Sequence, residues 1–106
     1  MAGKDVQTDL KRQADAGIQV IKLPDAEAQK LMNDTEYGLT AAVYCRDQYR
    51  AREILKGVNA GSAYINCCDR VSPRLPWSGR GVSGVGLTLS TYGIETFTRP
   101  KAWHIK

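Results

Sequence analysis

The sequence predicts an α/β fold: a partial three-layer unit with a short, mostly parallel sheet and one further strand at the C-terminus. Two apolar runs, "LTAAVYC" at 39–45 and "SAYIN" at 62–66, have the length and composition of strands in a buried sheet. Amphipathic helical patterns at 24–34 and 47–58 alternate with these runs, which is typical of parallel strands. Only about three strands are available for the sheet, so we expect it to keep an open edge.

Each predicted helix has a recognisable start. Pro24 stands at the first position of one helix and is followed by acidic residues, which favour the N-terminal turn. Asp47 is a good N-cap for the other. The apolar residues of each helix fall on one face: Ala28, Leu31 and Met32 in the first, and Ala51, Ile54, Leu55 and Val58 in the second.

The remaining segments carry weaker signals. Residues 1–16 are polar and predict a weak helix or a disordered leader, and 17–23, "GIQVIKL", favours a first short strand. A long irregular segment at 67–87 holds four glycines and two prolines. Residues 88–97 can form a short helix, and 98–106 are expected to close the chain as a strand.

The 106-residue chain has a net charge of +4, but its basic residues are dispersed among acidic ones, as on solvated helix faces. The densest basic stretch is the tail "TRPKAWHIK", where cations flank an aromatic side chain that could stack on nucleic-acid bases. We favour an amphipathic strand there, so a nucleic-acid partner is not expected. No apolar run is long enough to span a bilayer and the N-terminal residues lack a signal-peptide core, so we expect no membrane association and a cytoplasmic location.

The three cysteines do not form a recognisable site. An odd count argues against a complete disulfide framework, and the adjacent pair Cys67 and Cys68 is not a C-x-x-C motif. Cys45 ends an apolar run and is expected to be a buried small side chain. A nucleophilic role for Cys67 or Cys68 would need a base, and His104 is the one imidazole in the sequence. We therefore expect neither a metal centre nor a thiol nucleophile.

A glycine pattern invites comparison with nucleotide-binding loops. Gly79, Gly81 and Gly84 in "SGRGVSGVG" spell G-x-G-x-x-G, the dinucleotide-binding fingerprint. That fingerprint follows a strand, opens a helix and has an acidic residue about 20 positions later. Here "SPRLPW" precedes the glycines, and its two prolines are incompatible with a central strand. We therefore interpret the glycines as forming a tightly turned loop.

Four blocks carry a family resemblance: "LMNDTEYGLTAAVYCRD", "GSAYINCCD", "LPWSGRGVSGVG" and "STYGIETFTRPK". In this order and spacing, from 17 to 106, they resemble the C-terminal part of the aldehyde dehydrogenase superfamily. The resemblance implies that 17–97 form the end of a catalytic domain and that 98–106 form a terminal strand of an oligomerisation region. It also implies that the loop after "YIN" borders the aldehyde tunnel, with Val71 and Trp77 lining the substrate pocket. The other residues expected near that pocket are Asp69, Arg70, Pro76, Gly79 and Gly84.

The family's cysteine nucleophile, glutamate base, oxyanion-hole asparagine and cofactor domain all belong to motifs upstream of the matched region. The resemblance therefore implies NAD or NADP for the full-length enzyme, but no catalytic, cofactor-binding or metal-binding residue in this chain. We expect a C-terminal part of an NAD(P)-dependent aldehyde dehydrogenase that is inactive alone. Its expected partners are the upstream domains or a second copy. The alternative is a non-catalytic assembly module derived from that family.

Overall fold

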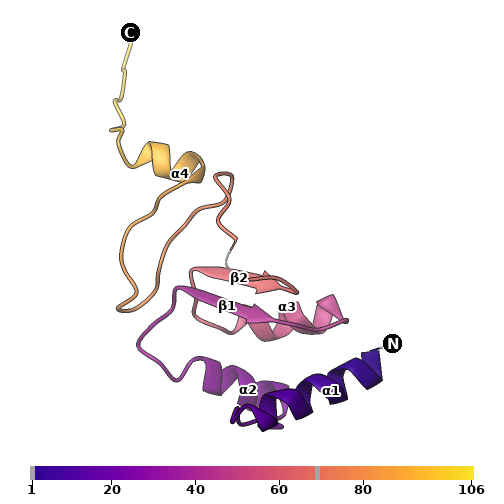
Figure 1. The fold of residues 1–106 in the computed structure, drawn as a ribbon. Helices are drawn as coiled ribbons and strands as arrows, with labels where there is room; N and C mark the ends of the chain where they lie inside the picture. Colours follow the sequence, from indigo (N-terminus) through magenta and orange to yellow (C-terminus); the bar gives the residue numbers. More distant parts are fainter. Residues whose placement is uncertain (1, 69) are drawn as a thin grey trace.

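The computed structural model describes residues 2–68 and 70–106. Within them the elements follow one another as two helices, then a strand, a helix and a strand, and finally a short helix (Figure 1). Their bounds are α1 (Ala2–Asp15), α2 (Asp25–Met32), β1 (Thr40–Val43), α3 (Gln48–Lys56), β2 (Ser62–Ile65) and α4 (Ser90–Glu95).

The centre of the fold is a β1–α3–β2 unit. The two strands are parallel and in register from Thr40 opposite Ser62 to Val43 opposite Ile65. Helix α3 contacts both strands and lies against one face of this sheet, and α2 packs on α3 from the side away from the sheet (Figure 1). A parallel pair joined by a helix is the predicted partial α/β unit.

The strand predicted at 17–23 is absent, and this prediction was wrong for the described structure. The segment has neither helical nor strand structure, and Ile18 and Ile21 are each 55% exposed. The run has strand-forming side chains, but a strand also needs a neighbour to accept its backbone hydrogen bonds. The sheet of the described residues consists of β1 and β2 only. The two-sided burial predicted from the run at 39–45 is not reached either, because Ala41, Ala42 and Val43 are only half-buried.

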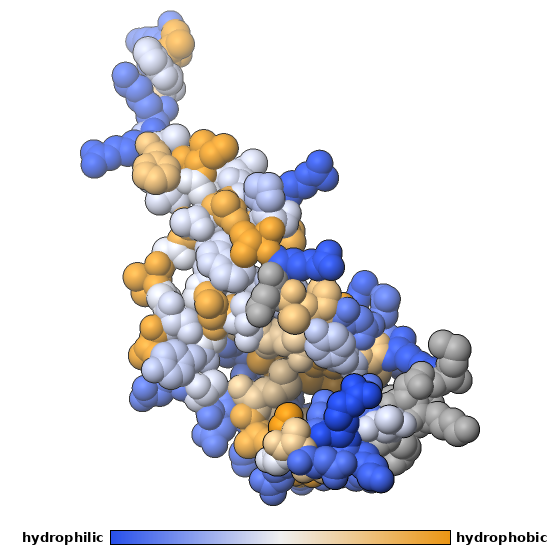
Figure 2. Space-filling model, viewed as in Figure 1, coloured by the Kyte–Doolittle hydropathy of each residue, from blue (hydrophilic) through white to orange (hydrophobic). Residues whose placement is uncertain are grey.

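The apolar core is very small. Among the described residues, the buried apolar side chains are Ala51 and Leu55, both on α3. The accessible surface is 9286 Å², whereas a folded monomer of 11.7 kDa is expected to expose about 5,900 Å². The radius of gyration is 19.0 Å, against about 13 Å for a compact chain of this length. Figure 2 shows apolar side chains, in orange, scattered over the exposed surface. The described part of the chain leaves most of its large apolar side chains exposed.

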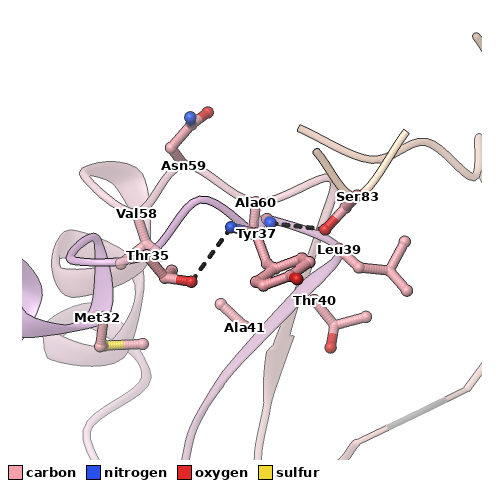
Figure 3. A pocket seen from close by; sticks show the side chains of 11 residues that line it. Met32, Thr35, Tyr37, Leu39, Thr40, Ala41, Val58, Asn59, Ala60 and Ser83 are labelled. Atoms are coloured by element: carbon pink, nitrogen blue, oxygen red, sulfur yellow. Dashed lines mark hydrogen bonds between the residues drawn. The ribbon is translucent and has the colours of Figure 1, made fainter. Parts of the chain in front are cut away.

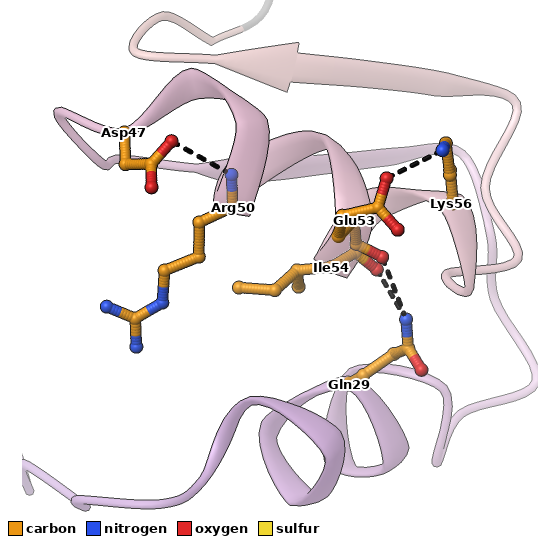
Figure 4. A network of polar contacts seen from close by, with 6 residues as sticks. All are labelled: Gln29, Asp47, Arg50, Glu53, Ile54 and Lys56. Atoms are coloured by element: carbon orange, nitrogen blue, oxygen red, sulfur yellow. Dashed lines mark hydrogen bonds and ion pairs between the residues drawn. The ribbon is translucent and has the colours of Figure 1, made fainter.

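Side chains of α2 fix the C-terminal end of α3. The amide Nε2 of Gln29 donates a 2.6 Å hydrogen bond to the carbonyl of Ile54 (Figure 4). Asn33 Nδ2 donates to the Gly57 carbonyl at 2.6 Å, and Asn33 Oδ1 accepts from the backbone N–H of Asn59 at 2.8 Å. The bond from Asn33 Nδ2 supplies a donor to the carbonyl at the helix C-cap, and the bond from Asn59 pairs a backbone N–H of the turn that follows. A side chain at Gly57 would overlap the Gln29 amide, so the Gln29 side chain would have to move and would lose its bond to Ile54.

The N-terminal end of α3 is held by two carboxylates. Asp47 is the predicted N-cap, and its Oδ1 accepts from the backbone N–H groups of Tyr49 and Arg50 at 3.0 and 3.2 Å (Figure 4). The Arg50 guanidinium donates two hydrogen bonds to Asp25 at 2.8 and 2.7 Å. These bonds lower the pKa of the Asp25 carboxyl and raise the pKa of Arg50. The pair ties the start of α2 to the start of α3.

The ends of the chain extend away from the sheet. Residues 2–15 form the helix α1, which is one of the two structures that the sequence predicts for 1–16. Residues 98–106 run outward from α4 without helical or strand structure (Figure 1). A strand forms by pairing, and within this single chain the tail has no paired neighbour, so the terminal oligomerisation strand stays a prediction. None of the helices in the described part of the chain is sufficiently long and apolar to traverse a bilayer.

Candidate functional site

The glycine-rich loop docks onto the start of both strands through Gly38. The Gly38 carbonyl accepts hydrogen bonds from the backbone N–H groups of Gly61 at 2.9 Å and Arg80 at 3.0 Å, and its own N–H donates to Ser83 Oγ at 2.8 Å. Gly38 is buried, and a Cβ atom there would stand 2.5 Å from the carbonyl oxygen of Asn59. The "NDTEYGL" and "SGRGVSG" blocks are therefore one packed unit.

An open cavity of about 480 Å³ lies beneath this junction, between the end of α2 and the first residues of β1 (Figure 3). The sticks in Figure 3 show Tyr37 within it, with the Tyr37 N–H bonded to Thr35 Oγ1 at 3.2 Å. No Asp, Glu, Lys, Arg or His side chain of the described residues lines it. It offers an apolar surface for packing rather than groups for acid–base chemistry.

The three glycines of the G-x-G-x-x-G pattern form a turn, as predicted. Gly81 and Gly84 have φ angles of 56° and 144°, where glycine is strongly preferred. At Gly79 a Cβ atom would stand 2.9 Å from the carbonyl carbon of Ser83. The next helix, α4, begins only at Ser90, so these glycines do not open a helix that could face a phosphate.

Trp77 is anchored at the other end of the loop. Its backbone N–H and carbonyl pair with Thr88 at 2.8 and 3.0 Å, forming an isolated antiparallel bridge. The half-buried side chain lines a cavity of about 260 Å³, together with Arg70, Pro76 and residues of β2. Tyr64 of β2 donates its hydroxyl to the Arg70 carbonyl at 2.9 Å. The loop thus places Trp77 and the backbone of Arg70 beside β2.

The structure brings most of the predicted pocket residues together around Pro76. Pro76 also lines a second cavity of about 560 Å³, which Gly79 and Gly84 share. Val71 is 61% exposed and lines neither of these two cavities. Asp69 lies outside the described residues. The assignment of Val71 and Trp77 to an aldehyde pocket stays a prediction.

Asn66 is a structural residue that the sequence reading missed. Its side chain both accepts from the Cys45 N–H at 2.8 Å and donates to the Cys45 carbonyl at 2.9 Å, and its own N–H donates to the Val43 carbonyl at 3.0 Å. It has a φ of 56°, a conformation that asparagine tolerates better than most residues. Asn66 therefore locks the carboxyl ends of β1 and β2, the edge where α/β folds place ligands. The signal available in the sequence was an asparagine directly after a strand.

The three cysteines lie just after the carboxyl ends of β1 and β2, and the histidine lies in the tail. Cys45 and Cys67 are half-buried and Cys68 is exposed, so Cys45 is not the buried residue predicted. His104 lies in the exposed C-terminal segment that runs away from the sheet (Figure 1). Within residues 2–68 and 70–106, no group of three or more His, Cys, Asp or Glu side chains could hold a metal ion.

Comparison with known proteins agrees with this geometry. The model of the aldehyde dehydrogenase family matches residues 18–103. An aldehyde dehydrogenase of Agaricus bisporus is 38% identical over 87 residues, which cover 81% of this chain and 17% of that protein. A chloroplastic betaine aldehyde dehydrogenase of Atriplex hortensis is 37% identical over 84 residues, covering 79% of this chain and 16% of the relative. The chain therefore spans only a small part of the length of these relatives.

Solved structures show the same relationship in three dimensions. PnpE from Pseudomonas sp. WBC-3 superposes with a TM-score of 0.69 at 36% identity, over 74% of this chain and 16% of PnpE. Betaine aldehyde dehydrogenase from Staphylococcus aureus superposes with a TM-score of 0.70 at 30% identity, over 76% of this chain and 16% of that enzyme. The sequence blocks, the β1–α3–β2 unit and the docked glycine loop all fall within the matched region. The chain belongs to the aldehyde dehydrogenase family.

Proposed function

We propose that this chain is the C-terminal part of an NAD(P)-dependent aldehyde dehydrogenase and that it is not catalytic alone. In this proposal residues 17–97 complete the catalytic domain, and the loop with Val71 and Trp77 forms one wall of the aldehyde tunnel. The half-buried ring of Trp77 beside a cavity suits a wall that packs against an apolar substrate chain and excludes water.

The observation that carries the proposal is the unfinished core. The chain exposes about 3,400 Å² more than a folded monomer of its mass is expected to expose. Each partner of an obligate interface buries about 1,000–2,500 Å², so the excess on this one chain is at least as large as such an interface. The large apolar side chains that remain open include residues of the predicted pocket loop, such as Val71, Leu75 and Val85. Covering them requires protein outside this chain.

The chemistry of aldehyde oxidation supports the same assignment. The reaction needs a positioned thiolate, donors for an oxyanion and a bound nicotinamide. The described loop provides an anchored aromatic ring and cavity walls, and we assign none of those three functions to it. NAD or NADP would be held by upstream domains that pair with this chain, and we assign the chain itself no cofactor. We also propose a cytoplasmic location, although the names of two relatives specify the chloroplast and the peroxisome.

An activity assay on the full chain tests the proposal. The chain is incubated with NAD or NADP and a panel of aldehydes, and absorbance of the reduced cofactor is followed. We expect no aldehyde-dependent signal above a protein-free control. Turnover that survives further purification would contradict the proposal.

A second candidate, an assembly module without a catalytic role, is favoured by the exposed tail. Phe97 is 92% exposed, Trp103 76% and Ile105 85%. When an extended segment is added to the edge of another sheet, its backbone forms hydrogen bonds with that edge and its apolar side chains pack on the partner. Native mass spectrometry distinguishes the two: a stable homo-oligomer of the chain alone favours the module, whereas a monomer favours a part that requires upstream domains.

A further inference from the structure

We infer that the cavity beside β2 selects aldehydes that carry a carboxylate, with Arg70 as the residue that binds it. This inference rests on the proposed function and names its substrate class. It starts from charge: between Arg70 and Ile94 the sequence has Arg70, Arg74 and Arg80 but no aspartate or glutamate. Asp69 and Glu95 flank this stretch, so residues 69–95 carry three cationic and two acidic side chains and keep a net charge of +1.

Arg70 differs from the other two arginines in its position. Arg70 is exposed and is one of the residues lining the 260 Å³ cavity, together with Trp77 and Tyr64, whereas Arg74 does not line that cavity. The Arg80 guanidinium is already engaged, donating to Ser78 Oγ at 3.0 Å and to the Gly79 carbonyl at 3.1 Å. Arg70 is thus the arginine of this loop that borders the cavity.

The backbone beside the guanidinium is fixed, which favours a binding role. The Tyr64 hydroxyl donates to the Arg70 carbonyl at 2.9 Å, and the Trp77–Thr88 bridge holds the opposite wall. The described residues provide no carboxylate partner for Arg70, since their ion pairs are those of Arg12, Arg50 and Lys56. The carboxylate of a substrate can be this partner, because the planar guanidinium binds carboxylates through two parallel hydrogen bonds.

The same arrangement disfavours cationic substrates. A quaternary ammonium group near Trp77 would gain a contact with the aromatic face but would meet the positive charge of Arg70 in the same cavity. The order of preference at this cavity is therefore carboxylate first, uncharged chain second and ammonium last.

Nuclear magnetic resonance on the full chain, labelled with nitrogen-15, tests the inference. Butyrate imitates the carboxylate end of the substrate, butyramide is the uncharged match, and the reporter is the indole N–H of Trp77. Trp103, in the distant tail, is an internal control. We expect butyrate to shift the Trp77 signal saturably and butyramide to leave it unchanged. A shift of equal size with both compounds, or none with butyrate, overturns the inference.

Variants assign the effect to one residue. Arg70→Gln is expected to weaken butyrate binding about tenfold or more, since a charge-assisted hydrogen bond is lost, and Arg70→Lys to weaken it less. Arg74→Gln removes the same charge from the same loop and should keep the affinity of the parent chain. Equal losses in Arg70→Gln and Arg74→Gln would mean that only the general charge of the loop attracts butyrate, which contradicts the assignment. Backbone amide signals of β1, α3 and β2 that match those of the parent chain show that each variant is folded alike.

The proposed function and the carboxylate preference are tested by separate results. Aldehyde turnover by the chain alone would overturn the proposed function and leave the butyrate response of Trp77 in place. If butyrate does not shift the Trp77 signal, the carboxylate preference is overturned and the activity result is unaffected.

Discussion

Gly61 lies so close to the carbonyl of Ser78 that a Cβ atom on the glycine would overlap it. This contact brings the start of β2 against the glycine-rich loop, and the bonds of Gly38 to Gly61 and Arg80 lie directly beside it. The placement of the predicted pocket loop therefore depends on the absence of a side chain at the position just before β2.

We expect Gly61→Ala to detach the loop from β2. The overlap involves backbone rather than a flexible side chain, so one of the two segments must move. Hydrogen exchange followed by mass spectrometry should show faster exchange at the Arg80 and Thr88 amides. Gly84→Ala is the control, because nothing lies within 4 Å of its added Cβ and only backbone strain is introduced. Unchanged exchange in Gly61→Ala would refute the close contact.

Asn66 should contribute to stability in two separable ways. Asn66→Gly loses the two side-chain bonds to Cys45 but keeps easy access to the φ of 56°. Asn66→Ala loses the bonds and strains the backbone as well. We expect unfolding free energies in the order parent, Gly, Ala, with about 1 kcal/mol between the last two. Urea denaturation followed by circular dichroism measures the order, and an alanine variant more stable than the glycine variant would contradict it.

The N-cap of α3 provides a local test. Asp47→Ala removes the acceptor for the Tyr49 and Arg50 N–H groups, and we expect a loss of about 1 kcal/mol in unfolding free energy. Asp47→Asn retains an acceptor oxygen and should lose less. Equal losses in both variants would show that charge near the helix end, rather than the cap bond, accounts for the effect.

The ion pair between Asp25 and Arg50 predicts a dependence of stability on pH. Because the folded-state pKa of Asp25 lies below its usual value of about 4, its contribution is present above that pH and is lost as the pH falls through the folded pKa. Asp25→Asn should therefore lower the melting temperature at neutral pH, and the difference from the parent should vanish in acid. Asp34→Asn, at a carboxylate with no ion pair in the described residues, is the control. A constant difference at every pH would contradict the role of the ion pair.

The features predicted from sequence are those with local signals. Asp47 before an amphipathic run predicted the start of α3, and the uniform apolar run at 39–45 predicted β1. The turn formed by Gly79, Gly81 and Gly84 followed from the prolines that precede it.

The features that sequence reasoning missed depend on distant partners. The run at 17–23 has the side chains of a strand, yet the described chain supplies it with no neighbouring strand. Gly38 acts through Gly61, Arg80 and Ser83, which lie 23 or more positions away, and nothing near Gly38 in the sequence indicates them. Burial was overestimated for the same reason, since an apolar run shows that a surface needs covering but not which protein covers it.

The central claim is that this chain completes a catalytic unit whose remainder lies outside it. The most direct test is co-expression of the full chain with the Agaricus bisporus aldehyde dehydrogenase truncated before the matched segment. Purified together, the two should oxidise butanal with NAD or NADP, whereas the truncated enzyme alone and the chain alone should not. A stable complex of the two without turnover, or turnover by this chain alone, would contradict the account.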